Sequence, residues 1–343
     1  MIAPATLEVE RTTPASRAGV VGAAVVAAGL VALPWLGDAG LMRAIVEFIA
    51  LLVLAQMWNL LAGYAGLVSI GQQAYVGLGG YALIVLADDL GVDPFLAVPL
   101  AGLAAAGFAL PTAALVFRFR DAYFAVGTWA VAEVYRLLIA NTDALGRGTG
   151  RTLKAVFPLA RETREGVTYA IAVTVGVAAV VVVYLYLRSR LGLGLMAVRD
   201  SEPASASLGV DVFRTKLVVY VVVAFGTGTT GALLYLNLLR ISPDAAFSIN
   251  WTAYTIFIVV IGGLGTLEGP IVGTVVFFLL RQLLADYGAW YMILLGSLAV
   301  LTMMRYPRGL WGLVADRWDL HFFPVQRRVR RDVERAAVEN GRA

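Results

Sequence analysis

Apolar residues run almost continuously along this chain, and short polar segments interrupt them. Ten apolar segments can be delimited, at residues 18–36, 43–62, 65–87, 95–117, 122–140, 167–187, 217–239, 251–265, 270–286 and 289–304. A helix needs about 20 apolar residues to cross a bilayer, so most segments are long enough, and the last three suit partial or tilted helices. A transmembrane β-barrel does not fit, because its strands alternate apolar and polar positions. The pattern predicts an all-α polytopic membrane protein with about ten transmembrane or partial helices.

The residue types present exclude most catalytic chemistry. Hydrophobic residues make up 60% of the chain and charged residues 15%, against about 25% charged residues in soluble domains. The chain has no cysteine, which excludes disulfides, thiolate metal sites and cysteine nucleophiles, and its single histidine, His321, lies in the polar C-terminal region. The apolar segments hold no paired aspartates and no nucleophile beside a base. We expect no enzymatic activity, metal site or cofactor in this chain.

Polar composition divides the chain into an N-terminal segment at 1–17, a membrane domain at 18–304 and a tail at 305–343. The tail carries nine arginines against five acidic residues. Basic segments stay preferentially on the cytoplasmic side of a membrane, so a cytoplasmic anchor explains the tail better than nucleic-acid binding does. We expect both termini in the cytoplasm. We also expect that the first apolar run is retained as a span, because no clear cleavage site follows it.

The charges of the loops fit this orientation with one exception. Arg118 and Arg120 flank one loop, the segment 188–216 is basic, and residues 88–93 form an acidic loop. Residues 141–166 carry five cationic and three acidic residues but fall on the outer side in this scheme. If one early span were wrong, the first half of the chain would be inverted relative to the second.

A polar island at 188–216 separates two apolar segments and carries five cationic and three acidic residues. Part of it is predicted to form a short helix. Ser201 is a favourable N-cap, and Glu202 and Pro203 suit the first turn. Gly209 suits the position just after the last turn. A small capped helix on the cytoplasmic side of a membrane domain is suited to docking, which suggests that a partner drives this protein.

The chain contains no loop for binding the phosphates of ATP. Residues 146–152 are the nearest candidate, but they lack the lysine and the glycine spacing of a P-loop. The only lysines are Lys154 and Lys216. If ATP drives this protein, another chain must bind it.

A glycine-rich segment at 63–81 interrupts the apolar pattern with six glycines and two glutamines. Irregular backbone at membrane depth is tolerated only against protein or a water-lined cavity, so this composition indicates a translocation path. Close helix packing through small residues, with Gly77 and Gly80 against a neighbour, explains the glycines equally well. For Gln72 and Gln73 we favour the path, because buried amides need polar partners.

Two pairs of charged residues lie within or beside apolar segments. Glu133 and Arg136 are three residues apart and therefore share a helix face. Charges at membrane depth mark functional positions by default, yet an internal ion pair that positions the helix is the simpler interpretation, and Arg136 could instead reach toward the surface. Arg43 and Glu47 admit the same ion-pair interpretation.

Two other glycine-rich segments have structural interpretations. The glycines and threonines at 226–231 predict close packing between helices. The run at 262–270 cannot be a regular helix, because glycines permit tight turns and Pro270 lacks an N–H donor. A close-packed turn is the simplest interpretation, and contact of Glu268 with a partner is the alternative.

Taken in order, these motifs resemble the permeases of branched-chain amino acid ABC importers, the LivH/LivM family, and the LivM branch more closely. The resemblance covers most of residues 59–285. It rests on Gly63-Tyr64-Ala65-Gly66 with Ser69-Ile70-Gly71, Asp121-Ala122-Tyr123-Phe124-Ala125 with Thr128, Glu133 and Arg136, Arg199-Asp200-Ser201-Glu202 with Leu208-Gly209-Val210-Asp211, and Ile241-Ser242-Pro243 with 262–270. Gln72 stands where that family commonly has a histidine, and Gln73 where it commonly has a small residue.

The resemblance implies an ABC importer permease fold and half of a translocation path for leucine, isoleucine, valine or related small amino acids. It implies three kinds of protein partner: a homologous second permease, two cytosolic P-loop ATPases that bind ATP and Mg²⁺, and an extracytoplasmic substrate-binding protein. It also implies contact with the lipid of a prokaryotic plasma (inner) membrane. No nucleic acid is implied. The implied ATPase-coupling residues are Arg199, Asp200, Ser201, Glu202 and Gly209. The candidates for the substrate path are Gly66, Ser69, Gly71, Gln72, Gln73, Tyr75, Thr128 and Glu133.

Two alternatives stay open at this point. An ABC permease for urea, short amides or aromatic acids would carry the same motifs. A secondary transporter driven by an ion gradient would need ionisable residues near the middle of the membrane, and only Glu133 qualifies.

Overall fold

The structure, a computed structural model, describes residues 9–10, 14–35, 38–284, 290–306, 308–318, 322–323 and 328–329. The long helices of the membrane domain are α1 (Pro14–Ala32), α2 (Ala39–Asn59), α3 (Gln72–Ile84), α4 (Pro94–Val116), α5 (Asp121–Ala140), α6 (Arg161–Arg188), α9 (Val212–Leu238), α11 (Asn250–Gly262), α12 (Gly269–Leu284) and α13 (Trp290–Arg305). Shorter helices are α7 (Arg190–Asp200), α8 (Glu202–Ser207), α10 (Pro243–Ala246) and α14 (Gly309–Trp318). Two small ribbons pair β1 (Val9–Glu10) with β4 (Arg328–Val329) and β2 (Arg151–Thr152) with β3 (Arg240–Ile241).

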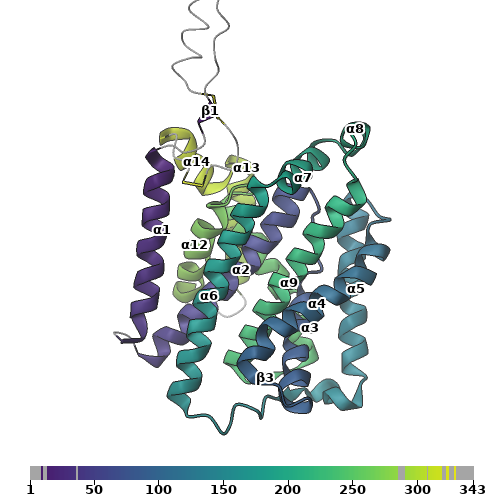
Figure 1. Cartoon of the computed structure of the whole chain (residues 1–343), viewed down its shortest axis with the longest axis vertical. Coiled ribbons are helices and arrows are strands. Elements are labelled where there is room, and N and C mark those ends of the chain that lie inside the picture. The colour runs from purple at the N-terminus through teal and green to yellow at the C-terminus, as the bar shows by residue number, and fades with distance from the viewer. Residues whose placement is uncertain are drawn as a thin grey trace, which may run out of the picture.

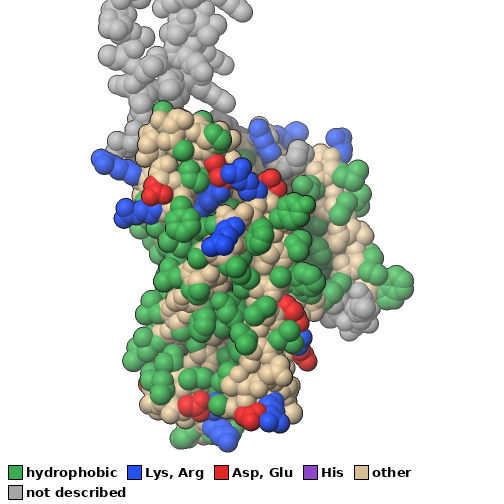
Figure 2. All heavy atoms as spheres, turned by 90° about the vertical axis from the view of Figure 1, so that its right-hand side faces the viewer, with side chains coloured by type: hydrophobic (Ala, Val, Ile, Leu, Met, Phe, Trp, Pro, Cys, Tyr) green, Lys and Arg blue, Asp and Glu red, His purple; other side chains and the backbone are tan. Residues whose placement is uncertain are grey.

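The helices form a bundle with two distinct ends (Figure 1). One end carries α7, α8 and α14 and is called the α8 end, and the other carries the β2–β3 ribbon and is called the β3 end. In the described part of the chain, β1 and β4 lie at the α8 end, which also carries the helices of the 188–216 island. Figure 2 shows apolar side chains over the middle of one face and basic side chains gathered toward the α8 end.

The predicted all-α membrane fold is confirmed. Among the described residues, six helical stretches are long and apolar enough to cross a membrane, namely Ala39–Tyr64, Pro94–Val116, Asp121–Ala140, Arg161–Arg188, Val212–Leu238 and Pro243–Gly262. Val21–Ala32 and Gly269–Leu284 are shorter apolar helices. Each of the ten predicted segments overlaps a helix, but the third begins later than predicted, at Gln72 rather than at residue 65.

The third segment begins late because the backbone before α3 is irregular. The end of α2 continues as a π-helical turn, Leu60–Tyr64 (η2), and residues 66–71 then leave the helical path. Gly66 has a φ of +71°, a left-handed conformation that glycine adopts without steric cost. A second π-helical turn, Val85–Asp89 (η3), ends α3 at the β3 end.

Helix α9 lies at the centre of the bundle and packs against α2, α3, α4 and α6. Its backbone approaches α3 so closely that a Cβ added at Gly79 would overlap the Gly228 carbonyl oxygen, and one added at Gly231 would overlap the Val76 carbonyl oxygen. Small residues allow such contact between helix backbones in a membrane, where burial from water contributes little to helix association. The packing interpretation of the stripe at 226–231 is therefore supported by the structure.

The β3 end explains the basic loop that did not fit the charge pattern. Arg151 from the 141–166 loop donates to both carboxylate oxygens of Asp89, at 2.6 and 2.7 Å. The Asp88 carboxylate accepts from the backbone N–H groups of Lys154 at 3.0 Å and Ala155 at 2.8 Å. The Arg151 hydrogen bonds hold the pKa of Asp89 below its usual range. The cationic loop is thus matched by the acidic loop at the same end, opposite the 188–216 island.

The turn between α11 and α12 is closely packed, as its glycines predicted. At the α8 end, α14 lies against it, and Gly309, with a φ of +67°, sits where any side chain would overlap Gly263. The Phe323 N–H donates to the Glu268 carboxylate at 2.9 Å. Part of the predicted tail is therefore a helix that covers this turn, and Glu268 has a partner within the chain.

The predicted pairing of Arg43 with Glu47 is wrong. Glu47 accepts from Arg281 of α12 at 2.6 Å, and Arg43 lies 4.0 Å from Glu165 of α6. Each side chain therefore points to a different neighbouring helix, and spacing along α2 could not reveal those partners.

Replacement of Gly79 by alanine is expected to destabilise the protein by about 1–3 kcal/mol, because the new Cβ would push α3 away from α9. The matched control is Gly107→Ala on α4, where an added Cβ meets nothing within 4 Å. Thermal unfolding in detergent measures the effect. The unfolding midpoint of Gly79→Ala should lie below that of the wild type, and the midpoint of Gly107→Ala should be unchanged or slightly higher. Equal midpoints for the two variants would contradict this packing.

Candidate functional site

Residues 66–71 form an interruption between α2 and α3, called the break below. Its backbone groups are bonded by side chains from neighbouring elements. Trp58 Nε1 donates to the Ser69 carbonyl at 2.9 Å, and the Ile70 N–H donates to Thr128 Oγ1 of α5 at 3.1 Å. The Gly71 N–H donates to Ser69 Oγ at 3.1 Å. Irregular backbone is therefore stabilised here by protein, as it must be at membrane depth.

Gln72 and Gln73 begin α3 and face other helices of the same chain. Their exposed fractions are 3% and 1%. Thr227 Oγ1 of α9 donates to Gln72 Oε1 at 3.1 Å, and Thr252 Oγ1 of α11 donates to Gln73 Oε1. The polar partners that these amides were expected to need are thus threonines, and in this conformation the two glutamines fasten α3 to α9 and α11.

The other candidates for the path divide into buried and accessible positions. Ser69, Gly71, Tyr75 and Thr128 are buried, and a Cβ at Gly71 would overlap the Thr128 backbone. Tyr75 packs edge-on against Tyr220 of α9, with ring centroids 5.8 Å apart. By contrast, the structure exposes Gly66. The accessible surface of the break therefore lies near its α2 end, with its other end held inside the bundle.

The glycines at 77–80 are packing positions. An added Cβ at Gly77 would meet the Phe247 ring, and one at Gly80 would overlap the Tyr235 ring. The packing interpretation accounts for these glycines, while Gly66 is explained by its left-handed backbone.

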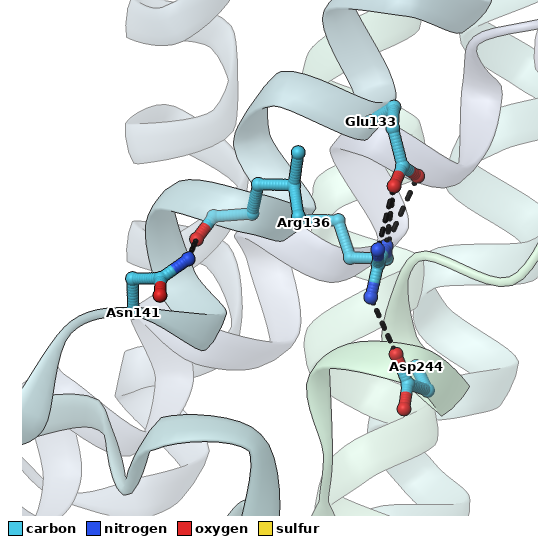
Figure 3. Close-up of polar contacts among 5 residues, drawn as sticks. Glu133, Arg136, Asn141 and Asp244 are labelled. Atoms are coloured by element: carbon cyan, nitrogen blue, oxygen red, sulfur yellow. Dashed lines mark hydrogen bonds and ion pairs between the residues drawn. The ribbon is translucent and has the colours of Figure 1, made fainter.

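Glu133 and Arg136 form the predicted ion pair on α5 (Figure 3). Arg136 Nε donates to both Glu133 carboxylate oxygens at 3.0 Å, and Arg136 Nη1 donates to Asp244 of α10 at 2.6 Å. The Glu133 side chain remains 43% exposed and the Asp244 side chain 80% exposed. One guanidinium thus joins two carboxylates and ties α5 to α10, a link that the sequence did not reveal because Asp244 lies 108 residues away.

The 188–216 island folds into two helices, α7 and α8, where the sequence predicted one. For α8 the predicted caps are confirmed: Ser201 Oγ accepts from the Ala204 N–H at 3.4 Å, and Gly209 follows the helix with a φ of +85°. Glu202 forms an ion pair with Lys216 at the start of α9. The exposed positions of α8 are uncharged apart from Glu202, whose side chain is 41% exposed, and the helix is followed by Leu208, which is 83% exposed.

Helix α7 is attached to the bundle beside the break. Arg199, one residue before its end, donates from Nη1 to the Gly63 carbonyl at 2.9 Å and also pairs with Asp200 at 3.0 Å. The five proposed coupling residues therefore lie together on α7, α8 and the turn that follows. Among them, Arg199 bonds to the backbone of η2.

Sequence reasoning missed two buried amides on α2. Asn59 donates to the Thr266 carbonyl at 2.8 Å and accepts from the Gly265 N–H at 2.8 Å. Gln56 donates to the Leu267 carbonyl at 2.8 Å. Two amides three residues apart in an otherwise apolar segment are the signal that could have marked a polar contact face.

The fold and this interrupted site define a polytopic helical membrane protein of the transport class. The family described as "branched-chain amino acid transport system / permease component" matches residues 40–303. The chain therefore belongs to the family of permease components of branched-chain amino acid transport systems. The family is one of transport components, and the apolar helices of this chain support a multi-pass protein of the inner membrane.

Two curated relatives are similar to this chain. Both are named high-affinity branched-chain amino acid transport system permease protein LivM. The one from Salmonella typhimurium is 28% identical over 280 residues, and the one from Escherichia coli is 27% identical over 280 residues. In both cases the match covers 74% of this chain but 65% of the relative, so the chain spans about two thirds of their length. No solved structure matches the chain significantly.

Gln73 and Thr252 are expected to contribute to stability in an energetically coupled way. Gln73→Leu leaves the Thr252 hydroxyl without its acceptor, and Thr252→Val leaves the side-chain amide and the backbone N–H of Gln73 without their partner. Each change should cost about 1–3 kcal/mol. The double variant removes both groups and should lose less than the sum of the single losses, by about 1 kcal/mol. Unfolding in detergent of all four proteins measures this difference, and strictly additive losses would contradict the contact.

Proposed function

We propose that this chain is one permease subunit of an ATP-driven importer for branched-chain amino acids, leucine, isoleucine and valine, or related small amino acids. The single observation that carries the proposal is the capped, exposed helix α8, held through Arg199 to an interrupted helix inside the bundle. Membership of the permease family supports the same function. The two curated relatives are named for high-affinity branched-chain amino acid transport.

The proposed partners divide by side. Two cytosolic P-loop ATPases bind ATP and Mg²⁺, and a homologous second permease completes the path. One of the ATPases docks on the exposed surface of α8, where Glu202 is the charged residue. An extracytoplasmic binding protein delivers the amino acid to the β3 end, including the 141–166 loop. Closure of the ATPases displaces α7 and α8, and the displacement reaches the break. No cofactor is bound by this chain itself.

The cargo would pass between this chain and the second permease, along the accessible side of the break. Gly66, which is exposed, is the proposed path residue at the α8 end, and Glu133 is the one nearer the β3 end. Gln72 and Gln73 would act by holding α3 in place, because their amides already bond to threonines. A binding protein supplies the selectivity. The path itself needs only a different affinity for the amino acid in its outward-open and inward-open states.

A secondary transporter is the second candidate, and Glu133 is its one specific observation. A coupling carboxylate must gain and lose its ion during transport. Here Arg136 donates three hydrogen bonds to Glu133, two from Nε at 3.0 Å and one from Nη2 at 2.6 Å, which favours the positioning role.

Uptake of labelled leucine tests the function and separates these candidates. Cells that lack other leucine importers should accumulate leucine when they express this chain with its partner subunits. Excess isoleucine or valine should compete, whereas urea and acetamide should not. Accumulation should survive a protonophore while ATP is maintained and should stop when ATP is depleted. Uptake that follows the proton gradient instead would reject the importer, and competition by urea or acetamide alone would change the cargo.

The orientation is expected to place α8 in the cytoplasm and the 141–166 loop outside. The chain contains no cysteine, so single substitutions Ala206→Cys on α8 and Gly148→Cys at the β3 end report on one position each. Both positions are exposed. A membrane-impermeant maleimide applied to intact cells should label Gly148→Cys only, and label Ala206→Cys after lysis. Labelling of Ala206→Cys in intact cells would invert the proposed topology.

Substitutions at Glu202 and Gly209 should uncouple ATP hydrolysis from uptake. Gly209→Ala is strained by about 1–2 kcal/mol, because its φ of +85° disfavours any Cβ. Glu202→Gln removes the ion pair with Lys216. In both variants the chain should insert and ATP hydrolysis should continue while uptake falls. The control is Gly194→Ala on α7, where the nearest atom to an added Cβ is 3.8 Å away. Normal uptake in both variants would refute the coupling role of α8.

A further inference from the structure

The Gly63 carbonyl is the point at which the polar island touches the interrupted helix. In a regular helix this carbonyl would accept from the N–H of Leu67, four residues on. Here the Leu67 N–H donates to the Leu61 carbonyl at 3.0 Å, and the Arg199 guanidinium donates to Gly63 at 2.9 Å. A cation therefore takes the place of the missing helical bond at the carbonyl end of the helix, where positive charge is favourable.

The same stretch of η2 is fastened to a second element. A Cβ at Gly63 would come within 2.7 Å of the Gly265 nitrogen, so the two backbones are in direct contact. Asn59 adds hydrogen bonds to Gly265 and Thr266 at 2.8 Å each. The end of η2 and the turn before α12 therefore form one packed unit, and Arg199 bonds to that unit from the side of α7.

The break begins immediately after this unit and ends on other helices. Gly66 allows the chain to turn, and its added Cβ would lie 3.1 Å from Arg199 Cγ. From there Ile70 is bonded to Thr128 of α5. A short path of contacts thus runs from the end of α7 through one guanidinium and the break to α5.

We propose that Arg199 is a positioning residue that passes the displacement of α8 to the break, given the importer function proposed above. Arg199 stands two residues before Ser201, the N-cap of α8, so α8 cannot move far without moving this side chain. Its guanidinium fork holds Gly63 with Nη1 and Asp200 with Nε and Nη2. Only arginine presents donors in both directions from one rigid plane, and lysine offers a single point charge.

The complete importer reconstituted in liposomes tests this role, with ATP as the nucleotide and leucine as the cargo. Arg199→Gln should keep ATP hydrolysis near the wild-type rate while leucine transported per ATP falls by about fivefold or more. Arg199→Lys should give an intermediate ratio. The matched control is Arg190→Gln, at the exposed first position of the same helix, which should keep the wild-type ratio.

Distance measurements distinguish a residue that transmits the movement of α8 to the break from one that only stabilises the fold. Because the chain contains no cysteine, spin labels can be placed in pairs at Ala206 on α8, Val68 in the break and Gly148 at the β3 end. In the wild-type importer, ATP should change both the 206–148 and the 68–148 distances. With Arg199→Gln, the first distance should still change and the second should not.

Two results would overturn the proposal. One is a change at Val68 that persists in Arg199→Gln together with a wild-type ratio of leucine to ATP. The other is failure of both Arg199 variants to assemble, which would make Arg199 a folding residue. If the wild-type importer accumulates no leucine, the proposed function fails instead, and the spin-label distances still decide the role of Arg199, because they require only ATP.

Discussion

The structure depends on one constraint, that every backbone polar group at membrane depth finds a partner within the protein. The chain leaves helical geometry at residues 66–71. Trp58 and Thr128 bond to backbone groups of this break, and Arg199 bonds to the carbonyl of Gly63 just before it. Each of these side chains comes from a different helix. The break is therefore stable only in this assembly, and a movement of any of the three helices changes the conditions that hold it. Such an element is well placed to change state in a transport cycle.

Different interactions hold the two ends of the bundle together. At the β3 end, ion pairs such as Arg151 with Asp89 close the loops, and these exposed pairs are individually weak. At the α8 end, two amides and one guanidinium donate to backbone carbonyls inside the protein. A carbonyl that loses its donor there has few other groups to accept from, so the loss is costly. Between them, α3 and α9 touch through glycine backbones. The centre is thus closely packed, and the hydrogen bonds from amide and guanidinium side chains lie at the end where the proposed ATPases would dock.

Local signals were predictable from the sequence, whereas distant contacts were not. Ser201 and Gly209 marked both ends of α8 because capping depends on neighbouring residues alone. The membrane segments followed from hydropathy for the same reason. The start of α3 was misplaced, and Asn59 was missed, because their geometry depends on partners far along the chain, such as Thr266. Among the path candidates, the role of Gln72 depended on the position of Thr227, which no spacing in the sequence gives.

The central claim is that this chain works as half of a path moved by separate ATPases. Purification of the tagged chain from its native membrane in mild detergent, followed by mass spectrometry of the accompanying proteins, tests it most directly. The account predicts that two P-loop ATPase copies and a second, homologous permease accompany the chain. Recovery of the intact, folded chain alone would contradict the account, would favour a secondary transporter, and would make Glu133 the next residue to test.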